Sequence, residues 1–521
     1  MQNQVHAVLL DTVSIQRYIF STNNLKENIG ASRIVEDIYD SHLKEVIKGL
    51  FMVSDDYYYN AWEENPEKIA ILEDLSHFEI GYIGGGNALL FFKEEQMAKE
   101  FIKRWSMRLL IHCPGLIPAC AVGEIDFNDF SKSLKNLFKQ LAENKSSFVP
   151  ETIIRRHGIT AECPNTGYSA EIWCEKLPEK KKNYISSVSN AKIMKAEEAN
   201  NKLQGILQDC GLADKYTFTD EIDKLGQTKR EESHIAIVHI DGNDMGKRFQ
   251  SLNDLVSLRK LSKSVREATL NAFKEMLKKL DENIKNGKIE KEGIKLQKEN
   301  GKIILPLRPI IIGGDDITFV SEGRLGIWLA KIFLEEFQRQ EVSDGKGLTA
   351  CAGVAITKTK YPFYRGYKLS EDLTRNAKDS GKKAKDDSSW IDFHIAYGGF
   401  SGELKEIRGN HYRTPSGDDL LLRPYKITDL DKLLSKINEL KRQFPRSKIM
   451  ELRSVLYAGK NEQRLFLEEL KARGLRLPEY NEFKGDEITS NGKTPYFDMI
   501  ELMDLYPEFA LPGGENENIQ S

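Results

Sequence analysis

Three acidic residues in the second half of the chain have the types and spacing needed for metal-assisted phosphoryl transfer. Asp315 and Asp316 follow Gly313 and Gly314 in a GGDD motif, and Asp241 ends an apolar run. Converging carboxylates repel one another unless a divalent cation neutralises them, and all-oxygen ligands favour Mg²⁺ or Mn²⁺ over zinc. Two such ions about 4 Å apart can activate a hydroxyl and stabilise a leaving pyrophosphate. The two glycines let a ligand approach the backbone.

The same motif is also a common composition for the tip of a β-hairpin. The surrounding pattern favours a site, because apolar runs flank GGDD and a further Asp ends a neighbouring strand. The predicted order is βαββαβ, the ferredoxin-like arrangement, in which the first strand lies beside the hairpin. Its elements are strand 235–240, helix 258–280, hairpin strands 303–312 and 317–320, a helix around 325–333 and strand 348–356. The charged stretch 283–302 lacks periodicity and is predicted to be a surface insertion.

Residues 1–150 repeat this pattern. An apolar strand, 5–10, ends at Asp11, and two short apolar runs flank GGGN at 84–87. The helical region 15–50 is predicted to be broken by the polar stretch STNNLKENIG. Two copies of one pattern indicate an internal duplication. The first copy has Gly86 and Asn87 where the second has its two acids, which predicts that only the second copy binds metal.

Further polar residues lie close to the acidic motif in sequence. Asp244 either aids the metal or a sugar hydroxyl, or it caps the next helix. Arg375, Lys378 and Lys382 recur at helical spacing. A charged helix face is by default a solvated surface, but beside a metal site it can hold the triphosphate of a nucleotide. We therefore predict that Lys378 and Lys382 contact phosphate.

Composition limits the class of protein. The 521 residues are enough for three or four domains at roughly 100 to 200 residues each. Lys and Arg number 76 against 79 Asp and Glu, which excludes a histone-like basic coat. No run approaches the roughly 18 apolar residues that cross a bilayer, and the N-terminus lacks the pattern of a signal peptide. Six scattered cysteines make no disulfide framework. These features predict a cytoplasmic protein without a membrane partner.

Three motifs together resemble the second palm domain of the large subunit of type III CRISPR effector complexes. They are HIDGNDMGK at 239–247, GGDD at 313–316 and YPFYRGYKLSEDLTRNAKDSGKK at 361–383. More distantly they resemble the GGDEF diguanylate cyclases. The first copy also fits, with SIQRYIF at 14–20, IGAS at 29–32 and the degenerate GGGN. The stretch LLLRPYKITDLDKLL at 420–434 resembles the family's C-terminal helical domain.

The resemblance implies a reaction in which ATP is converted to cyclic oligoadenylate second messengers when the complex meets target RNA. Asp241, Asp315 and Asp316 match the family's metal-binding carboxylates. Gly313 and Gly314 match the glycines over which the nucleotide lies. A ribose hydroxyl of one ATP would attack the α-phosphorus of another, and the lysines would steady the leaving pyrophosphate.

The resemblance also implies a second, acceptor ATP at the interface of the two palms, near Gly85 and Ser32. Ser32 has an alternative role, because it can simply cap a helix that begins at Arg33. The implied partners are guide RNA, target RNA, and the backbone and small helical subunits of an effector complex. Two other functions stay open: a non-catalytic RNA-binding scaffold subunit, and a free-standing enzyme that makes a cyclic dinucleotide or mononucleotide.

Many family members begin with an HD nuclease domain that uses a His-Asp doublet. No such doublet occurs in this sequence, and residue 5 already starts the first palm, so DNase activity is not expected. The middle segment contains CPNTG, which resembles an element of the family's zinc-binding module. Full zinc sites need four ligands, usually in two CxxC-like pairs. His157, Cys163 and Cys174 do not form such pairs, which favours a remnant that packs without metal.

The sequence therefore predicts an α/β (α+β) chain with two ferredoxin-like palm domains, a small middle domain and a C-terminal helical bundle. The expected domains are a degenerate first palm at 1–150, a zinc-module-like or helical segment at 151–230, a catalytic palm at 231–405 and a helical domain at 406–521. Thr428 and Asp431 are predicted to form a capping box, with further helix over 449–470.

Overall fold

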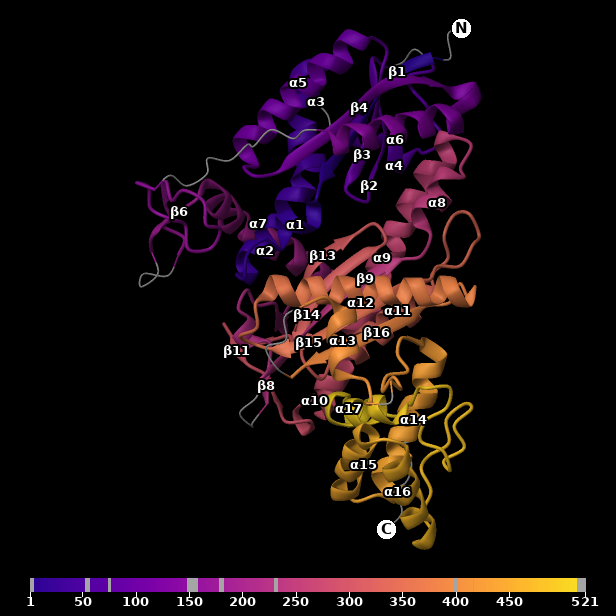
Figure 1. The fold of residues 1–521 in the computed structure, drawn as a ribbon. Helices are drawn as coiled ribbons and strands as arrows, with labels where there is room; N and C mark the ends of the chain where they lie inside the picture. Colours follow the sequence, from indigo (N-terminus) through magenta and orange to yellow (C-terminus); the bar gives the residue numbers. More distant parts are fainter. Residues whose placement is uncertain are drawn as a thin grey trace.

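The computed structural model places two sheets with their helices along the molecule, with a helical part at the far end (Figure 1). It describes residues 4–51, 57–73, 76–147, 158–177, 182–228, 233–397, 402–415 and 417–512. The α/β fold class with palm folds and added helices is confirmed. The domain boundaries stay predictions. No helix within these ranges is both long enough and apolar enough to cross a membrane.

The first sheet has four antiparallel strands in the order β2-β3-β1-β4, as a ferredoxin-like βαββαβ order requires. Its strands are β1 (Gln4–Val13), β2 (Phe78–Gly84), β3 (Asn87–Phe92) and β4 (Ile117–Asp126). Its helices are α1 (Ile15–Ile19), α2 (Leu25–Asp37), a π-helical turn (Ile38–His42), α3 (Leu43–Phe51), α4 (Tyr57–Glu64), α5 (Glu95–His112) and α6 (Phe130–Ser146).

Two predictions for helix α2 are wrong. The break in the polar stretch is short, because Asn24 caps a helix that begins at Leu25, with its side chain accepting from the Lys26 N–H at 3.0 Å. Ser32 therefore lies inside a helix and caps none. Polar α2 residues are helical because they are buried and paired: Glu27 accepts from Ser189 of α7 (Ser187–Asp209) at 2.6 Å.

The second sheet has six strands in the order β13-β14-β9-β15-β16-β17. These are β9 (His234–Gly242), β13 (Leu307–Gly313), β14 (Asp316–Glu322), β15 (Ala350–Lys358), β16 (Trp390–Ala396) and β17 (Tyr425–Lys426). The last two extend the predicted pattern. Its helices are α8 (Met245–Gln250), α9 (Leu255–Lys285), α11 (Gly326–Gln338) and α12 (Phe363–Ala384).

The stretch predicted to be a surface insertion is partly built into the fold. It contains α10 (Lys288–Lys291) and the short strands β10 (Ile294–Lys295) and β11 (Lys298–Glu299), with Ile289 and Ile294 buried. β12 (Lys302–Ile304) pairs with β7 (Tyr216–Thr217), and β10 pairs with β8 (Gln227–Thr228). The sequence does not predict these elements, because only a few residues of this charged stretch are buried.

The middle segment combines a small hairpin with a long helix, α7. The hairpin strands are β5 (Ile172–Trp173) and β6 (Tyr184–Ile185). Cys163 and Cys174 are both buried in one small cluster with Ile185 and Ile193. His157 lies outside the described residues, and a remnant that packs without metal stays a prediction.

The C-terminal part consists mainly of helices, which are α13 (Leu404–His411), α14 (Ile427–Gln443), α15 (Arg446–Ala458), α16 (Lys460–Ala472) and α17 (Tyr496–Leu505). The predicted capping box is wrong, because α14 begins one residue before Thr428 and Asp431 instead pairs with Lys331 at 2.9 Å. The run predicted as one helix is divided at Gly459, whose φ of 109° no other residue adopts easily.

Helices α2 and α7 pack closely and connect the middle segment to the first palm. A Cβ at Gly30 would lie 1.7 Å from the Lys192 carbonyl oxygen, so only glycine allows this approach. The Lys192 ammonium is fully buried and donates to the Tyr18 carbonyl at 2.6 Å and to Ser21 Oγ at 2.8 Å. Burial lowers the pKa of Lys192 to about 8.

We expect the stability of the protein, relative to a Lys192→Met variant, to rise with pH. Lysine has a pKa of 10.5 without burial, so between pH 8 and that value the unfolded chain binds more protons than the folded one. The cost of burying the ammonium is fully present below pH 8 and is lost as the pH rises, which amounts to about 3 kcal/mol. Urea unfolding of both proteins at pH 7 and pH 10 measures this change. A constant difference would contradict a depressed pKa.

Candidate active site

The GGDD motif is a hairpin tip beside the end of strand β9, as predicted. Gly313 pairs with Asp316 across the hairpin, and Asp316 pairs with Asp241 on β9. Gly314 has a φ of 59°, which glycine adopts without strain. The Gly242 N–H donates to the Asp315 carbonyl at 3.1 Å and ties the tip to the strand end. The structure thus brings all three acids to one corner.

The side chain of Asp315 lies directly against the end of β9. A Cβ at Gly242 would lie 2.7 Å from Asp315 Oδ2, so a larger residue there would displace the carboxylate. Thr269 of α9 donates to the Gly314 carbonyl at 2.6 Å and holds the tip from the other side. The position of the acid therefore depends on two neighbours outside the motif.

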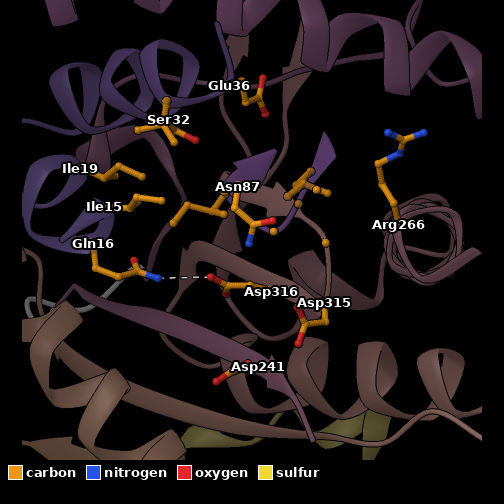
Figure 2. A pocket seen from close by; sticks show the side chains of 18 of the residues that line it. Ile15, Gln16, Ile19, Ser32, Glu36, Asn87, Asp241, Arg266, Asp315 and Asp316 are labelled. Atoms are coloured by element: carbon orange, nitrogen blue, oxygen red, sulfur yellow. Dashed lines mark hydrogen bonds between the residues drawn. The ribbon is translucent and has the colours of Figure 1, made fainter. Parts of the chain in front are cut away.

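Asp316 has one oxygen paired and one oxygen unpaired. Gln16 Nε2, from the first palm, donates to Asp316 Oδ2 at 3.2 Å (Figure 2). His239 Nδ1 lies 3.3 Å from Asp316 Oδ1 but is instead hydrogen-bonded to Thr318, at 3.0 Å. Burial lowers the pKa of His239, which keeps the ring neutral. Within the described part of the chain, Asp316 Oδ1 has no hydrogen-bond partner.

Both hairpin acids are harder to ionise than ordinary aspartates. Removal from water, together with the charges of Asp241 and Asp316, raises the pKa of Asp315 to about 7. Removal from water and the charge of Asp241 raise the pKa of Asp316 to about 8. This corner is therefore short of positive charge.

Lys378 places a cation directly beside the three acids. Its Nζ lies 2.6 Å from Asp241 Oδ2 and donates to the Gly242 carbonyl at 2.8 Å. Lys382 is exposed and does not line the cavity described below. Asp244 is also outside that lining: it occupies the position before α8 without capping it and pairs with Lys247 at 2.8 Å.

The first palm presents the matching corner without its acids. Gly84 pairs with Asn87, and Asn87 pairs with Asp11, just as Asp316 pairs with Asp241. Asp11 binds Lys145 at 2.8 Å, which repeats the lysine–aspartate pair of the second palm. The predicted duplication thus extends to individual side chains, with Asn87 in the place of Asp316.

A cavity of about 710 Å³ separates the two corners and is lined by both palms. A Cβ at Gly314 would lie 3.3 Å from the Gly85 Cα, so the two hairpin tips nearly touch. Figure 2 shows Ser32 and Asn87 on one side of the cavity and the three acids on the other. A second pocket of about 430 Å³ shares part of this lining and is mainly apolar. Of the predicted site residues, Gly313, Gly314, Asp315, Asp316, Asp241, Lys378, Gly85 and Ser32 line the larger cavity.

Residues 234–386 match a family model described as the second palm domain of Cas10/Cmr2. This segment of the chain is therefore similar to that palm domain. Among solved structures, it is similar to a Csm1–Csm4 cassette in complex with cA4, at 11 % identity and a TM-score of 0.54, covering 96 % of this chain and 70 % of that chain. A Csm1–Csm4 cassette in complex with AMPPNP is similar at 12 % identity and a TM-score of 0.53, covering 97 % of this chain and 70 % of that chain. Csm1 in T. onnurineus is similar at 13 % identity and a TM-score of 0.51, covering 97 % of this chain and 70 % of that chain. No curated protein matches the chain by sequence.

At these identities the structural likeness is one of fold, and it extends over nearly the whole chain. The matched family segment contains the GGDD hairpin, strand β9 and Lys378. The predicted resemblance to the second palm domain is therefore confirmed.

The fit of a divalent cation to this corner depends on the side chains that surround it. As they stand, no three His, Cys, Asp or Glu side chains in the described ranges are grouped to hold a metal ion. Asp241 forms an ion pair with Lys378, and Asp316 accepts a hydrogen bond from Gln16. The donors nevertheless suit Mg²⁺ or Mn²⁺, because all are carboxylate oxygens and one buried oxygen of Asp316 is unpaired. The residues fit such an ion.

Several residues that line this cavity are not predicted from the sequence. Gln16 lies in SIQRYIF, where the resemblance gives it no role, and Arg266 is one polar position of the amphipathic helix α9. Both line the cavity, where Arg266 also forms an ion pair with Glu63 of the first palm at 2.6 Å. Lys202 of α7 lines the cavity and binds Glu36 of α2 at 2.9 Å. Only the docking of separate segments brings these groups together, so no local sequence signal marks them.

Proposed function

We propose that the chain is a metal-dependent nucleotidyltransferase that converts ATP to cyclic oligoadenylates as a subunit of a type III CRISPR effector. The observation that carries this proposal is the facing pair of hairpins, one with Asp315 and Asp316 beside Asp241 and one with Gly86 and Asn87, across one cavity. Such a cavity suits two nucleotides, and only the one beside the acids of the second palm would be activated by metal. Solved structures of similar fold are titled as complexes with AMPPNP and with cA4, which supports a nucleotide substrate.

The proposed roles follow from the positions of the side chains. Asp241, Asp315 and Asp316 would hold Mg²⁺ or Mn²⁺, which neutralises phosphoryl charge and polarises the reacting oxygens. Gly313 leaves room for phosphate against the backbone, because a Cβ there would have no neighbour within 4 Å, and Gly314 forms the turn beside it. Lys378 supplies a cation next to the leaving pyrophosphate. The apolar second pocket, which is lined by α2, α7, α9 and β13, suits a base.

The acceptor nucleotide would lie against Gly85 and Ser32, where the first palm has no acids of its own hairpin. An acceptor needs only to be held, since its ribose hydroxyl attacks the nucleotide on the other side. Arg266 and Lys202 are cations at this cavity and can bind its phosphates.

The experiment is incubation of the purified protein with labelled ATP and Mg²⁺ or Mn²⁺, with and without target RNA, followed by chromatography and mass measurement. Cyclic oligoadenylates are expected. A cyclic dinucleotide or mononucleotide would show that the same site serves a free-standing cyclase. Absence of any product from ATP under all these conditions would contradict the proposal.

We also propose that the chain works within a ribonucleoprotein complex. The similar solved structures include Csm1–Csm4 cassettes, which supports a partner of the Csm4 type. Guide RNA, backbone subunits and small helical subunits are the expected further partners. Purification from the native host should recover them together with the chain, and recovery of the chain alone would favour a free-standing enzyme.

A further inference from the structure

Gln16 is a side chain of the first palm that reaches a proposed metal-site carboxylate of the second palm. It lies on the short helix α1, 300 residues away from its partner in sequence. Its Nε2 donates to Asp316 Oδ2 at 3.2 Å, and its Oε1 accepts from the Tyr367 hydroxyl at 2.6 Å. The dashed line in Figure 2 marks the first of these bonds.

The Asp316 carboxylate, in its ionised form, determines which end of the Gln16 amide faces it. An ionised carboxylate can only accept, so Asp316 needs the amide N–H₂, and the phenol donates to the amide oxygen that remains. Both bonds are satisfied in one orientation of the amide only. A neutral amide also fixes the carboxylate without adding a charge that would compete with a cation.

Tyr367 is itself held firmly. Its side chain is buried, and its ring stacks on Phe20 with ring centroids 3.6 Å apart and an interplanar angle of 18°. The His239 ring packs against the Tyr367 ring in a T-shaped arrangement, with the ring centroids 5.7 Å apart. Phe20 ends the same short helix that carries Gln16. The stack and the hydrogen-bond chain therefore join the same two elements, α1 and α12.

Helix α1 is fixed from its other side as well. Lys192 of α7 donates to the carbonyl of Tyr18, two residues after Gln16. The orientation of Asp316 thus depends on a first palm that is docked and on a middle segment that holds its first helix.

We propose that Gln16 is a positioning residue that orients Asp316 for the metal, with Tyr367 acting through it. One oxygen of Asp316 is bound by the amide, and Oδ1 is left without a partner for the cation. The degenerate palm then contributes directly to the metal site as well as to the nucleotide cavity. This inference rests on the proposed function.

The test uses the full chain and three variants: Gln16→Met, Tyr367→Phe and the double variant. Methionine keeps the length of glutamine and removes its donor. Two quantities are measured: the Mn²⁺ concentration that gives half-maximal product formation, and the Mn²⁺-induced rise in unfolding temperature without nucleotide. Loss of such a supporting hydrogen bond costs roughly 10- to 100-fold in metal affinity, so Gln16→Met should shift the Mn²⁺ requirement upward by about tenfold. Its KM for ATP at saturating Mn²⁺ should be unchanged.

The double variant separates positioning from general loss of structure. Because Tyr367 acts through Gln16, Tyr367→Phe should weaken Mn²⁺ binding in the wild-type background and have no further effect in Gln16→Met. Arg17→Met is the matched control, since Arg17 is an exposed neighbour on the same helix, and it should leave both measurements unchanged.

Additive losses, or an unchanged Mn²⁺ requirement in Gln16→Met, would overturn the inference. The unfolding measurement distinguishes it from the proposed reaction. A Gln16-dependent Mn²⁺ shift in a protein that makes no product from ATP would keep the positioning role and remove the reaction. Absence of any Mn²⁺ shift in the wild-type protein would overturn the positioning role together with the metal assignment.

Discussion

Replacement of Asp316 by asparagine should reduce product formation from ATP on the order of 10³-fold, the upper range for loss of one preorganised charge-stabilising group. The amide keeps the shape of the carboxylate and the bond to Gln16 is still possible, but it carries no negative charge to bind a divalent ion. The measurement is the initial rate with labelled ATP at saturating Mn²⁺. Urea unfolding shows whether the variant is folded.

The first palm provides the matched control for this experiment. Asp11 occupies the same place on β1 that Asp241 occupies on β9, and it likewise pairs with a lysine. It does not line the cavity. Asp11→Asn should therefore leave the rate unchanged, whereas Asp241→Asn should reduce it strongly. Equal effects of the two substitutions would show that the chemistry does not depend on the GGDD corner.

The hairpin and its neighbouring strand could be predicted from sequence because their determinants are local. Apolar strands on both sides of a Gly-rich tip define a hairpin, and the ferredoxin-like order places β9 beside it. Once that order is known, the pairing of Asp241 with Asp316 follows from adjacent strand ends. The duplication added the second corner, since the same reasoning applies to Asn87 and Asp11.

Helix α2 shows where local reasoning failed. Its first turns carry Glu27 and Asn28, and the Asn and Gly residues of the stretch STNNLKENIG are weak helix formers when read alone. Both are buried, and Glu27 is bonded to Ser189 of a helix some 160 residues later in the chain. Tertiary pairing made a helix from a sequence that looked like a turn, and it also placed Ser32 in the helix interior.

Strand β16 escaped prediction for a similar reason. It carries Asp392 and His394, both buried, among its apolar residues. Asp392 is acceptable there because Arg408 of α13 binds both its oxygens, at 2.8 and 2.9 Å. A buried charge is tolerated only with such a partner. The sequence around Asp392 does not indicate that Arg408 will pair with it. The same limit explains why Gln16 could not be assigned a role, since its partner is known only after the palms are docked.

Replacement of Lys378 by methionine should lower the rate of the reaction and at the same time tighten metal binding. The ammonium lies 2.6 Å from Asp241 Oδ2, so in the metal-free protein it occupies a carboxylate that the cation needs. Two like charges about 4 Å apart repel by several kcal/mol even at an effective dielectric constant near 20, so its removal should favour Mn²⁺ binding by about tenfold or more. The rate should fall roughly 100-fold, because the leaving pyrophosphate loses a cation.

These opposite effects distinguish a phosphate-binding lysine from one that only stabilises the fold, because a structural lysine would weaken both quantities together. Lys145→Met is the control, since Lys145 makes the equivalent ion pair with Asp11 in the first palm, and it should change neither the rate nor the Mn²⁺ requirement. Lys382→Met should affect the rate less than Lys378→Met, because Lys382 is exposed and outside the cavity lining. A Lys378→Met variant with weaker Mn²⁺ binding would mean that the lysine supports the carboxylate corner and does not compete for it.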